Sequence, residues 1–508
     1  MYSGRESLIT QSRVRLFESA TDLITGLLFV CFLYSFVLKV PSIGGPDFFF
    51  YILTGRDLSD GFEVGIMHYF YFPGIYWFWK YCFDLFGHNL LAIQSVYVGV
   101  LLLSSVFSAA CVYLLTRKKY AAFLAGSMYI ILLHILEGWG GVIEPIATLF
   151  MLLGLLFYLY FYQAQKYLAS ALSIVVFFGL CLFMKQQGIF FIAASAVLPF
   201  SELKRFFQIN KLTFLVPISA GLFVFGLILL EGGGLEAIRV SLSMAVNYSR
   251  TNTLAQNLSG YFMAIFPVFV PVLAFLMPIA LFALIDVVKS KKKFVNYFNL
   301  RFVIFLMFAG ILPLYQFKVR EYLHYGIYTV PALVILSGWA IASAFKWLAS
   351  ATKTKKILVL GLSVFFLFVS FNQHKEKIDH VHELIGWLPP HPLDSDIAKL
   401  SDVCSHLHGP NVLLLPPRVN TFHWICNTRS ASGKWAYSWY EEAAPHYFDI
   451  ISQQFVTDVF VFDKNFGDFE ERVLSRPDWA DLEKHLKNNN YSVSYSNSSG
   501  RLYKKNSF

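Results

Sequence analysis

The sequence predicts a polytopic α-helical membrane protein of about eleven transmembrane helices with a small α/β domain at its C-terminal end. Three observations predict this class. Hydrophobic residues make up 56% of the chain and charged residues 14%, whereas a soluble domain carries about 25% charged residues. Apolar runs long enough to cross a bilayer, at about 20 residues each, recur along most of the chain. After residue 372 the composition becomes that of a soluble domain.

The apolar runs define the expected spans, at 19–39, 89–115, 120–136, 145–163, 167–184, 188–202, 212–230, 260–285, 302–317, 326–349 and 357–372. The first run is too long for the core of a signal peptide, and no small-residue cleavage site follows it, so we expect it to remain as a span. The runs at 188–202 and 302–317 are short. The number of spans therefore stays open by one or two.

The basic residues predict the orientation. Lys and Arg gather in the segments on the side of the N-terminus, with clusters at 117–119, 289–293 and 353–356, and are sparse in the other loops. This asymmetry is typical of cytoplasmic loops. We therefore expect an integral protein of the cytoplasmic (inner) membrane, with a cytoplasmic N-terminus and an extracytoplasmic C-terminal domain. The net charge of +9 reflects this topology, and we expect the bilayer, and no nucleic acid, as a partner.

The first external loop, residues 40–88, contains a second apolar segment at 71–86 (YFPGIYWFWKYCFDLF). The segment is short and carries Lys80 and Asp84, so we expect an interfacial helix on the outer surface. The alternative, a true span, would invert everything after it and place the basic clusters outside. The expected domains are a membrane domain at 1–372, which includes this loop, and a soluble domain at 373–508.

The sequence predicts that the soluble domain is a small α/β unit. Helices are expected at DIAKLSDVCSHLH, EEAAPHYFDIISQQF and PDWADLEKHLKNN. Strands are expected at NVLLLP and DVFVFD, and a closing hairpin at YSVSYS with RLYKK.

One carboxylate of the external loop is a candidate for chemistry. Asp47 follows Gly44, Gly45 and Pro46 at the mouth of the first span and precedes a run of aromatic residues. A poorly hydrated carboxylate has a raised proton affinity, which suits a general base. The alternative is that Asp47 caps a helix over FFFYILTG. His68 lies on the same loop near the outer surface, where a histidine is more often structural than catalytic.

Further ionisable residues lie at the external ends of later spans. They are Glu144 in EGWGGVIEP, Lys185 in MKQQG, and Lys318, Arg320, Tyr322 and His324 in FKVREYLHYG. Such residues can be simple anchors. An apolar, outward-facing cavity that holds Lys and Arg is also suited to the phosphate of a lipid carrier.

These features resemble, in their order along the chain, the GT-C superfamily of membrane glycosyltransferases. Asp47 and Tyr51 follow the first span, a Gly-containing stretch occupies 54–61, and Tyr71–Phe72–Pro73 opens the interfacial helix. A span with a basic exit lies at 87–119, and MKQQG and the pair Arg320 and Tyr322 follow. The chain is similar to the protein mannosyltransferase and aminoarabinose transferase type. A lone Asp47 and Pro73–Gly74 stand where many relatives have two acidic residues or two prolines, which leaves the subfamily open.

The resemblance implies an inverting enzyme that moves a sugar from a polyprenyl-phosphate carrier to an acceptor hydroxyl outside the cytoplasm. Asp47 would be the general base, and no cofactor or metal is required. The donor phosphate would be bound by Lys185, Arg320, Lys318 and His324, and the substrates by Glu144, Tyr51, His68 and Tyr322. The acceptor could be a glycan, a lipid or a protein. A Cys404–Cys426 disulfide is expected, because these are the only cysteines of a domain in an oxidising compartment.

Other functions stay open. An envelope polysaccharide polymerase or ligase would place its basic site in a large loop between late spans, and the loop at 317–326 is short. A lipid or solute transporter would show charges near mid-span and two related halves, neither of which is evident. A non-catalytic scaffold would leave the external ionisable groups without a role.

Overall fold

The computed structural model describes residues 3–61, 72–202, 211–230, 254–290, 297–318, 323–391, 393–415, 420–430, 456–462 and 482–506. The chain divides into two compact units. The helical unit comprises 1–40, 95–238 and 242–388, and the α/β unit comprises 41–94, 239–241 and 389–508. This grouping places residues 41–94 with the C-terminal residues, whereas the sequence predicts a boundary at 373, with residues 40–88 in the membrane domain.

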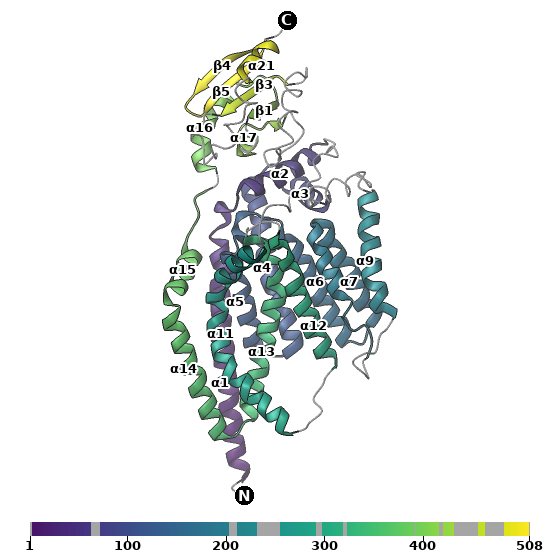
Figure 1. Ribbon diagram of the computed structural model, residues 1–508, viewed down its shortest axis with the longest axis vertical. Helices are drawn as coiled ribbons and strands as arrows, with labels where there is room; N and C mark the ends of the chain where they lie inside the picture. The colour runs from purple at the N-terminus through teal and green to yellow at the C-terminus, as the bar shows by residue number, and fades with distance from the viewer. Residues whose placement is uncertain are drawn as a thin grey trace. The chain divides into compact units, whose positions relative to one another are not determined.

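The helical unit is built from long helices, some of which are joined by short turns (Figure 1). Its α-helices are α1 (Ser3–Val37), most of α4 (Leu90–Thr116), α5 (Lys119–Ile135), α6 (Glu144–Gln163), α7 (Tyr167–Met184), α8 (Ile189–Ser195), α9 (Lys211–Leu230), α11 (Leu254–Ser290), α12 (Tyr297–Ile311), α13 (Val330–Ser350), α14 (Lys353–Gln373) and α15 (Lys375–Gly386). Short 3-10 helices between them are η3 (Gly138–Gly140), η4 (Gln186–Gly188), η5 (Leu312–Lys318) and η6 (Leu323–Thr329).

The helices have the length and surface of membrane spans. In the described part of the chain, 8 helical segments are long and apolar enough to cross a membrane, and two shorter apolar helices occupy Lys119–Ile135 and Asn257–Pro271. Apolar side chains face outward along these helices. On α9, Phe214, Ile218 and Leu222 recur every fourth residue and are 60%, 59% and 65% exposed, a stripe that suits lipid and not water. The protein is an integral membrane protein.

The expected span at 188–202 is wrong. The helix there, α8, has 7 residues, which is about 10 Å of helix and too short to cross a bilayer. The chain turns away after Ser195, and the Pro199 carbonyl accepts a hydrogen bond of 2.7 Å from the Tyr158 hydroxyl of α6. The other expected runs each overlap a described helix.

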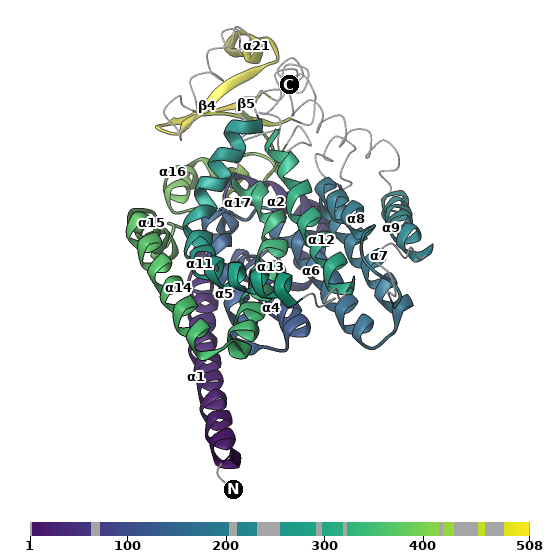
Figure 2. The same cartoon turned by 60° about the horizontal axis from the view of Figure 1, so that its bottom comes forward.

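Helices α6 and α7 pack as an antiparallel pair. A short turn joins α6 to α7, and α7 lies between α6 and α9 (Figures 1 and 2). Helix α1 packs on α5, and α5 packs on α13. Because α6 and α7 run in opposite directions, the first residue of α6 and the residue after α7 lie at the same end of the pair.

The first part of the α/β unit is a pair of helices, α2 (Pro46–Ser59) and α3 (Gly74–Phe86). Helix α3 has 13 residues and is about 20 Å long, which is short for a span. It buries Ile75, Trp79 and Phe83, while Lys80 and Asp84 pair at 2.6 Å on its other face. A short helix with one buried face is therefore present within 71–86, and its place at the membrane interface stays a prediction.

The C-terminal part is a five-stranded mixed sheet with the order β2-β1-β3-β5-β4. Its strands are β1 (Asn411–Leu415), β2 (Arg429–Ser430), β3 (Asp458–Phe462), β4 (Tyr491–Asn497) and β5 (Gly500–Lys505), and its helices are α16 (Asp394–Cys404), α17 (Asn420–Ile425) and α21 (Leu482–Asn488). Strand β1 is parallel to β2 and β3, and β5 is antiparallel to β3 and β4. The core joins α16, β1, α17, β3 and β5 through Leu400, Val403, Val412, Leu414, Phe422, Phe460 and Leu502.

The strands expected at NVLLLP and DVFVFD, the hairpin and the first helix are confirmed. The helix expected at 441–455 lies outside the described residues, and the one at 477–489 is described from Leu482. Cys404 and Cys426 form a disulfide, as expected, with their Cα atoms 5.0 Å apart. It ties the end of α16 to the residues that follow α17.

Candidate active site

Asp47 lies in the first turn of α2. The helix begins at Pro46, and its N-cap is Gly45 in an extended conformation without a side-chain cap. Asp47 is therefore not the cap, and the capping alternative is wrong. The side chain is half-buried, and Phe48 and Phe49 beside it are fully buried. The positive end of the helix dipole favours an ionised carboxylate, which is the form that a general base needs.

Tyr51 follows Asp47 by one turn of α2, so the two side chains lie on the same face of the helix. Tyr51 is 3% exposed, and its ring packs against Phe50 with centroids 5.2 Å apart. A tyrosine in this position can shape the space next to the carboxylate.

A second group of candidates meets in the helical unit, where a carboxylate and an ammonium form a buried ion pair. Glu144 is the first residue of α6, and Lys185 directly follows α7. The antiparallel packing of α6 and α7 brings them together, and the Lys185 ammonium donates to the Glu144 carboxylate. The side chains are 2% and 1% exposed. Each charge also suits its helix end, an anion at the N-terminus and a cation at the C-terminus.

The turn after Lys185 fixes the position of this ion pair. A Cβ atom on Gly188 would lie 2.4 Å from the Leu182 amide nitrogen, so the turn requires glycine. The Lys185 ammonium lies 5.2 Å from the centre of the Tyr325 ring, a cation–π contact from η6.

His324 of the same segment completes the cluster. Its Nδ1 lies 3.4 Å from the Glu137 carboxylate, and His324 is also within electrostatic range of Glu144.

The structure therefore brings Glu144, Lys185 and His324 together in the helical unit, and places Asp47 and Tyr51 in the α/β unit. The remaining candidates, His68, Arg320, Tyr322 and the side chain of Lys318, lie outside the described residues. In the part of the chain that is described, no group of three or more His, Cys, Asp or Glu side chains could hold a metal ion.

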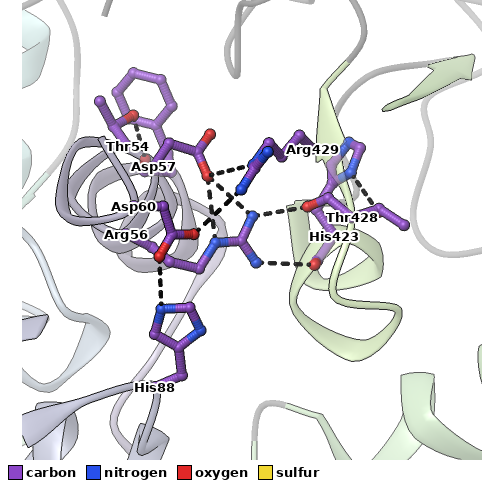
Figure 3. A network of polar contacts seen from close by, with 9 residues as sticks. Thr54, Arg56, Asp57, Asp60, His88, His423, Thr428 and Arg429 are labelled. Carbon is purple, nitrogen blue, oxygen red and sulfur yellow. Dashed lines mark hydrogen bonds and ion pairs between the residues drawn. The ribbon is translucent and has the colours of Figure 1, made fainter. Parts of the chain in front are cut away.

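A polar network that the sequence does not predict surrounds Arg56 of α2 (Figure 3). The Arg56 guanidinium donates to the carbonyls of His423, at 3.3 Å, and Thr428, at 2.7 Å. It also pairs with Asp57 at 3.1 Å. The only signal in the sequence was an adjacent Arg and Asp at the end of a helical run of aromatic residues, and nothing in it named the partners.

Arg429 extends the network to the partly exposed residues beside it. It lies 3.9 Å from Asp57 and 3.4 Å from Asp60, and His88 lies 3.2 Å from Asp60. The sequence suggests that Asp57 and Asp60 are solvated turn residues. This is wrong for Asp57, which is in α2 with its side chain 15% exposed.

Burial sets the protonation of two members of this network. Burial of the carboxyl group raises the pKa of Asp57 to about 6, although the charges of Arg56 and Arg429 act to lower it. The charge of Asp60 raises the pKa slightly further. Burial, together with the charge of Arg56, holds the pKa of His423 well below its ordinary value. The His423 imidazole is therefore neutral at physiological pH.

The fold of this chain is similar to that of a solved membrane protein of the aminoarabinose transferase type, one of the types that the sequence resembles. Two solved structures of ArnT from Cupriavidus metallidurans are similar over nearly their whole length. The apo form matches 96% of this chain and 98% of ArnT, with a TM-score of 0.52 and 13% identity. The form bound to undecaprenyl phosphate matches 97% and 98%, with a TM-score of 0.50 and 12% identity.

A third structure, the Archaeoglobus fulgidus oligosaccharyltransferase tethered with an acceptor peptide, matches 97% of this chain and 74% of that protein. Its TM-score is 0.49 at 10% identity. No protein-family model and no curated protein sequence matches the chain. At these identities the likeness shows the fold.

Proposed function

We propose that this protein is an inverting glycosyltransferase that moves a sugar from a polyprenyl phosphate to an acceptor hydroxyl on the outer side of the membrane. The acceptor oxygen attacks the anomeric carbon as the bond from that carbon to the phosphate oxygen breaks. The acceptor proton passes to the Asp47 carboxylate, and the lipid phosphate leaves with its bonding electrons. A direct displacement of this kind inverts the anomeric centre.

The observation that carries the proposal is the fold likeness to ArnT, which in one of its structures holds undecaprenyl phosphate. That molecule is a polyprenyl phosphate, the product that the proposed reaction would release. The match spans nearly the full length of both chains, so it includes both the helices and the C-terminal domain.

The Glu144–Lys185 pair supports a phosphate site near these helix ends. A buried cation needs a counter-charge, and Glu144 supplies it in the structure. A lipid phosphate would offer Lys185 a second anionic partner, and the cation would stabilise the charge that gathers on the leaving group. We assign Arg320, Lys318 and His324 to the same phosphate. Tyr51, His68, Tyr322 and Glu144 are assigned to the sugar and acceptor.

The location follows from the distribution of basic residues. We propose the cytoplasmic membrane, with the N-terminus in the cytoplasm and the C-terminal domain outside. The Cys404–Cys426 disulfide supports an oxidising compartment for that domain.

A donor panel tests the proposal. Purified protein in nanodiscs is incubated with polyprenyl-phosphate sugars and candidate glycan, lipid or peptide acceptors, and release of free lipid phosphate is measured. We expect release with one donor class, and only when an acceptor is present. No release from any donor, together with movement of a lipid or solute across sealed vesicles, would instead support the transporter alternative.

A further inference from the structure

Arg56 is a buried cation, and two of its hydrogen bonds reach a distant part of the chain. It lies near the end of α2, and its side chain is 3% exposed. Two of its donors bind the carbonyl oxygens of His423 and Thr428, more than 360 residues away in the sequence. An arginine fork suits such a pair of acceptors because its N–H groups are fixed in one plane.

The loop at 423–428 is held by further contacts that direct the carbonyl groups of His423 and Thr428 toward Arg56. The Thr428 amide donates to the His423 carbonyl at 3.0 Å. The side chains of the same residues bond at 2.8 Å between Nδ1 and Oγ1. Cys426, inside the loop, is held to Cys404 by the disulfide. These contacts orient the two carbonyl groups, and the hydrogen bonds of Arg56 add to the support of the loop.

Aromatic packing encloses the Arg56 contact. Trp424 of the loop lies 6.2 Å from Phe49 of α2 and 6.2 Å from Phe83 of α3, measured between ring centres. Helix α2 is pressed against α3 at Gly55, where an added Cβ would lie 2.4 Å from the Trp79 Cβ. The hydrogen bonds of Arg56 are therefore shielded from water, which strengthens them.

The charges of the network balance when Asp57 is ionised. Arg56 and Arg429 face Asp57 and Asp60, and His423 adds no charge. Figure 3 shows these side chains pointing toward one another between α2 and the loop at 423–428. The contact is thus a specific, charge-balanced attachment and not a chance surface pair.

We propose that Arg56 is a positioning residue for the sugar transfer, which fixes α2, and with it Asp47, against the loop at 423–428, which the Cys404–Cys426 disulfide ties to α16. This inference rests on the proposed function. Arg56 follows Asp47 by nine residues, about 14 Å along one helix, so it acts through α2 and touches no reacting atom. A misplacement of about 1 Å at the base costs on the order of 100-fold in rate. Loss of the attachment would therefore lower kcat and leave donor binding in the helical unit largely unchanged.

The test compares Arg56→Met with Arg501→Met in lipid nanodiscs. Arg501 also pairs with a carboxylate, Glu483 at 2.8 Å, but is 58% exposed. We expect Arg56→Met to lower kcat on the order of 100-fold with little change in KM for the lipid donor, and Arg501→Met to match the wild type. Arg56→Lys retains a charge but loses the fork, and should fall between them.

A second comparison separates positioning from folding. The Cys404→Ala/Cys426→Ala variant loosens the same loop and should also lower kcat. In the Arg56→Met background the two cysteine replacements should lower kcat little further, because both changes act on one attachment. Hydrogen exchange of 420–430 and of α2 should rise together in Arg56→Met. Unchanged kcat in a folded Arg56→Met protein, or additive effects of the two changes, would overturn the proposal. Absence of transfer in the wild type would refute the proposed function itself, whereas unchanged exchange in both segments would refute the attachment alone.

Discussion

Removal of one partner from the buried Glu144–Lys185 pair should destabilise the protein far more than removal of both. The side chains are 1% and 2% exposed, so Lys185→Met leaves a carboxylate buried without its cation. Such an uncompensated charge costs about 3–5 kcal/mol, whereas replacing a buried pair by neutral residues of similar volume is often close to neutral. We therefore expect Glu144→Gln/Lys185→Met to be more stable than Lys185→Met.

Thermal unfolding can be followed with a thiol-reactive fluorophore, because Cys111 and Cys181 are fully buried in the helical unit. The midpoint temperature of unfolding should fall in each single variant. In the double variant it should return most of the way to the wild-type value. A midpoint in the double variant that falls by the sum of the single effects would refute the ion-pair reasoning. The double variant should still transfer sugar on the order of 100-fold more slowly, because it lacks the cation that we propose stabilises the leaving phosphate.

Three further outcomes are expected. Because burial raises the pKa of Asp57 from its usual value near 3.8 to about 6, folding favours the protonated carboxyl. The stabilisation is present below about pH 4 and is lost as the pH rises through 6, a change on the order of 3 kcal/mol. Denaturant titrations should show that Asp57→Asn removes this part of the pH dependence. Maleimide labelling of unreduced protein should leave Cys404 and Cys426 unmodified, and labelling of both would contradict the disulfide. A protease added outside intact cells should cleave the C-terminal domain and spare an N-terminal tag, and the reverse pattern would invert the proposed topology.

The membrane fold was predictable because the length and composition of an apolar run decide whether a helix can cross a bilayer. The prediction of a span at 188–202 was wrong because it rested on the same criterion. The run is apolar throughout, but the chain leaves the helix after Ser195 and packs onto α6 through Pro199. Hydropathy does not register such a turn. In the C-terminal domain, the strands and their hairpin followed from β-branched and aromatic residues between turn signals.

The site was predictable only in part. Glu144 and Lys185 could be chosen because ionisable residues at the ends of spans are conspicuous, and the antiparallel helices then bring them together. Arg56 and Asp57 could not be chosen from the sequence in this way. Their burial depends on the loop at 423–428, and the partners of Arg56 there are backbone carbonyls, which every residue has. No residue type could indicate this pairing from the sequence.

The rate of sugar transfer in Asp47→Asn tests the central claim most directly. Asp394→Asn is its matched control, because Asp394 also lies in the first turn of a helix but is 69% exposed. With the same unfolding midpoint as the wild type, Asp47→Asn should release lipid phosphate at least about 100-fold more slowly, and Asp394→Asn should match the wild type. A wild-type rate in Asp47→Asn would contradict the assignment of Asp47 as the base.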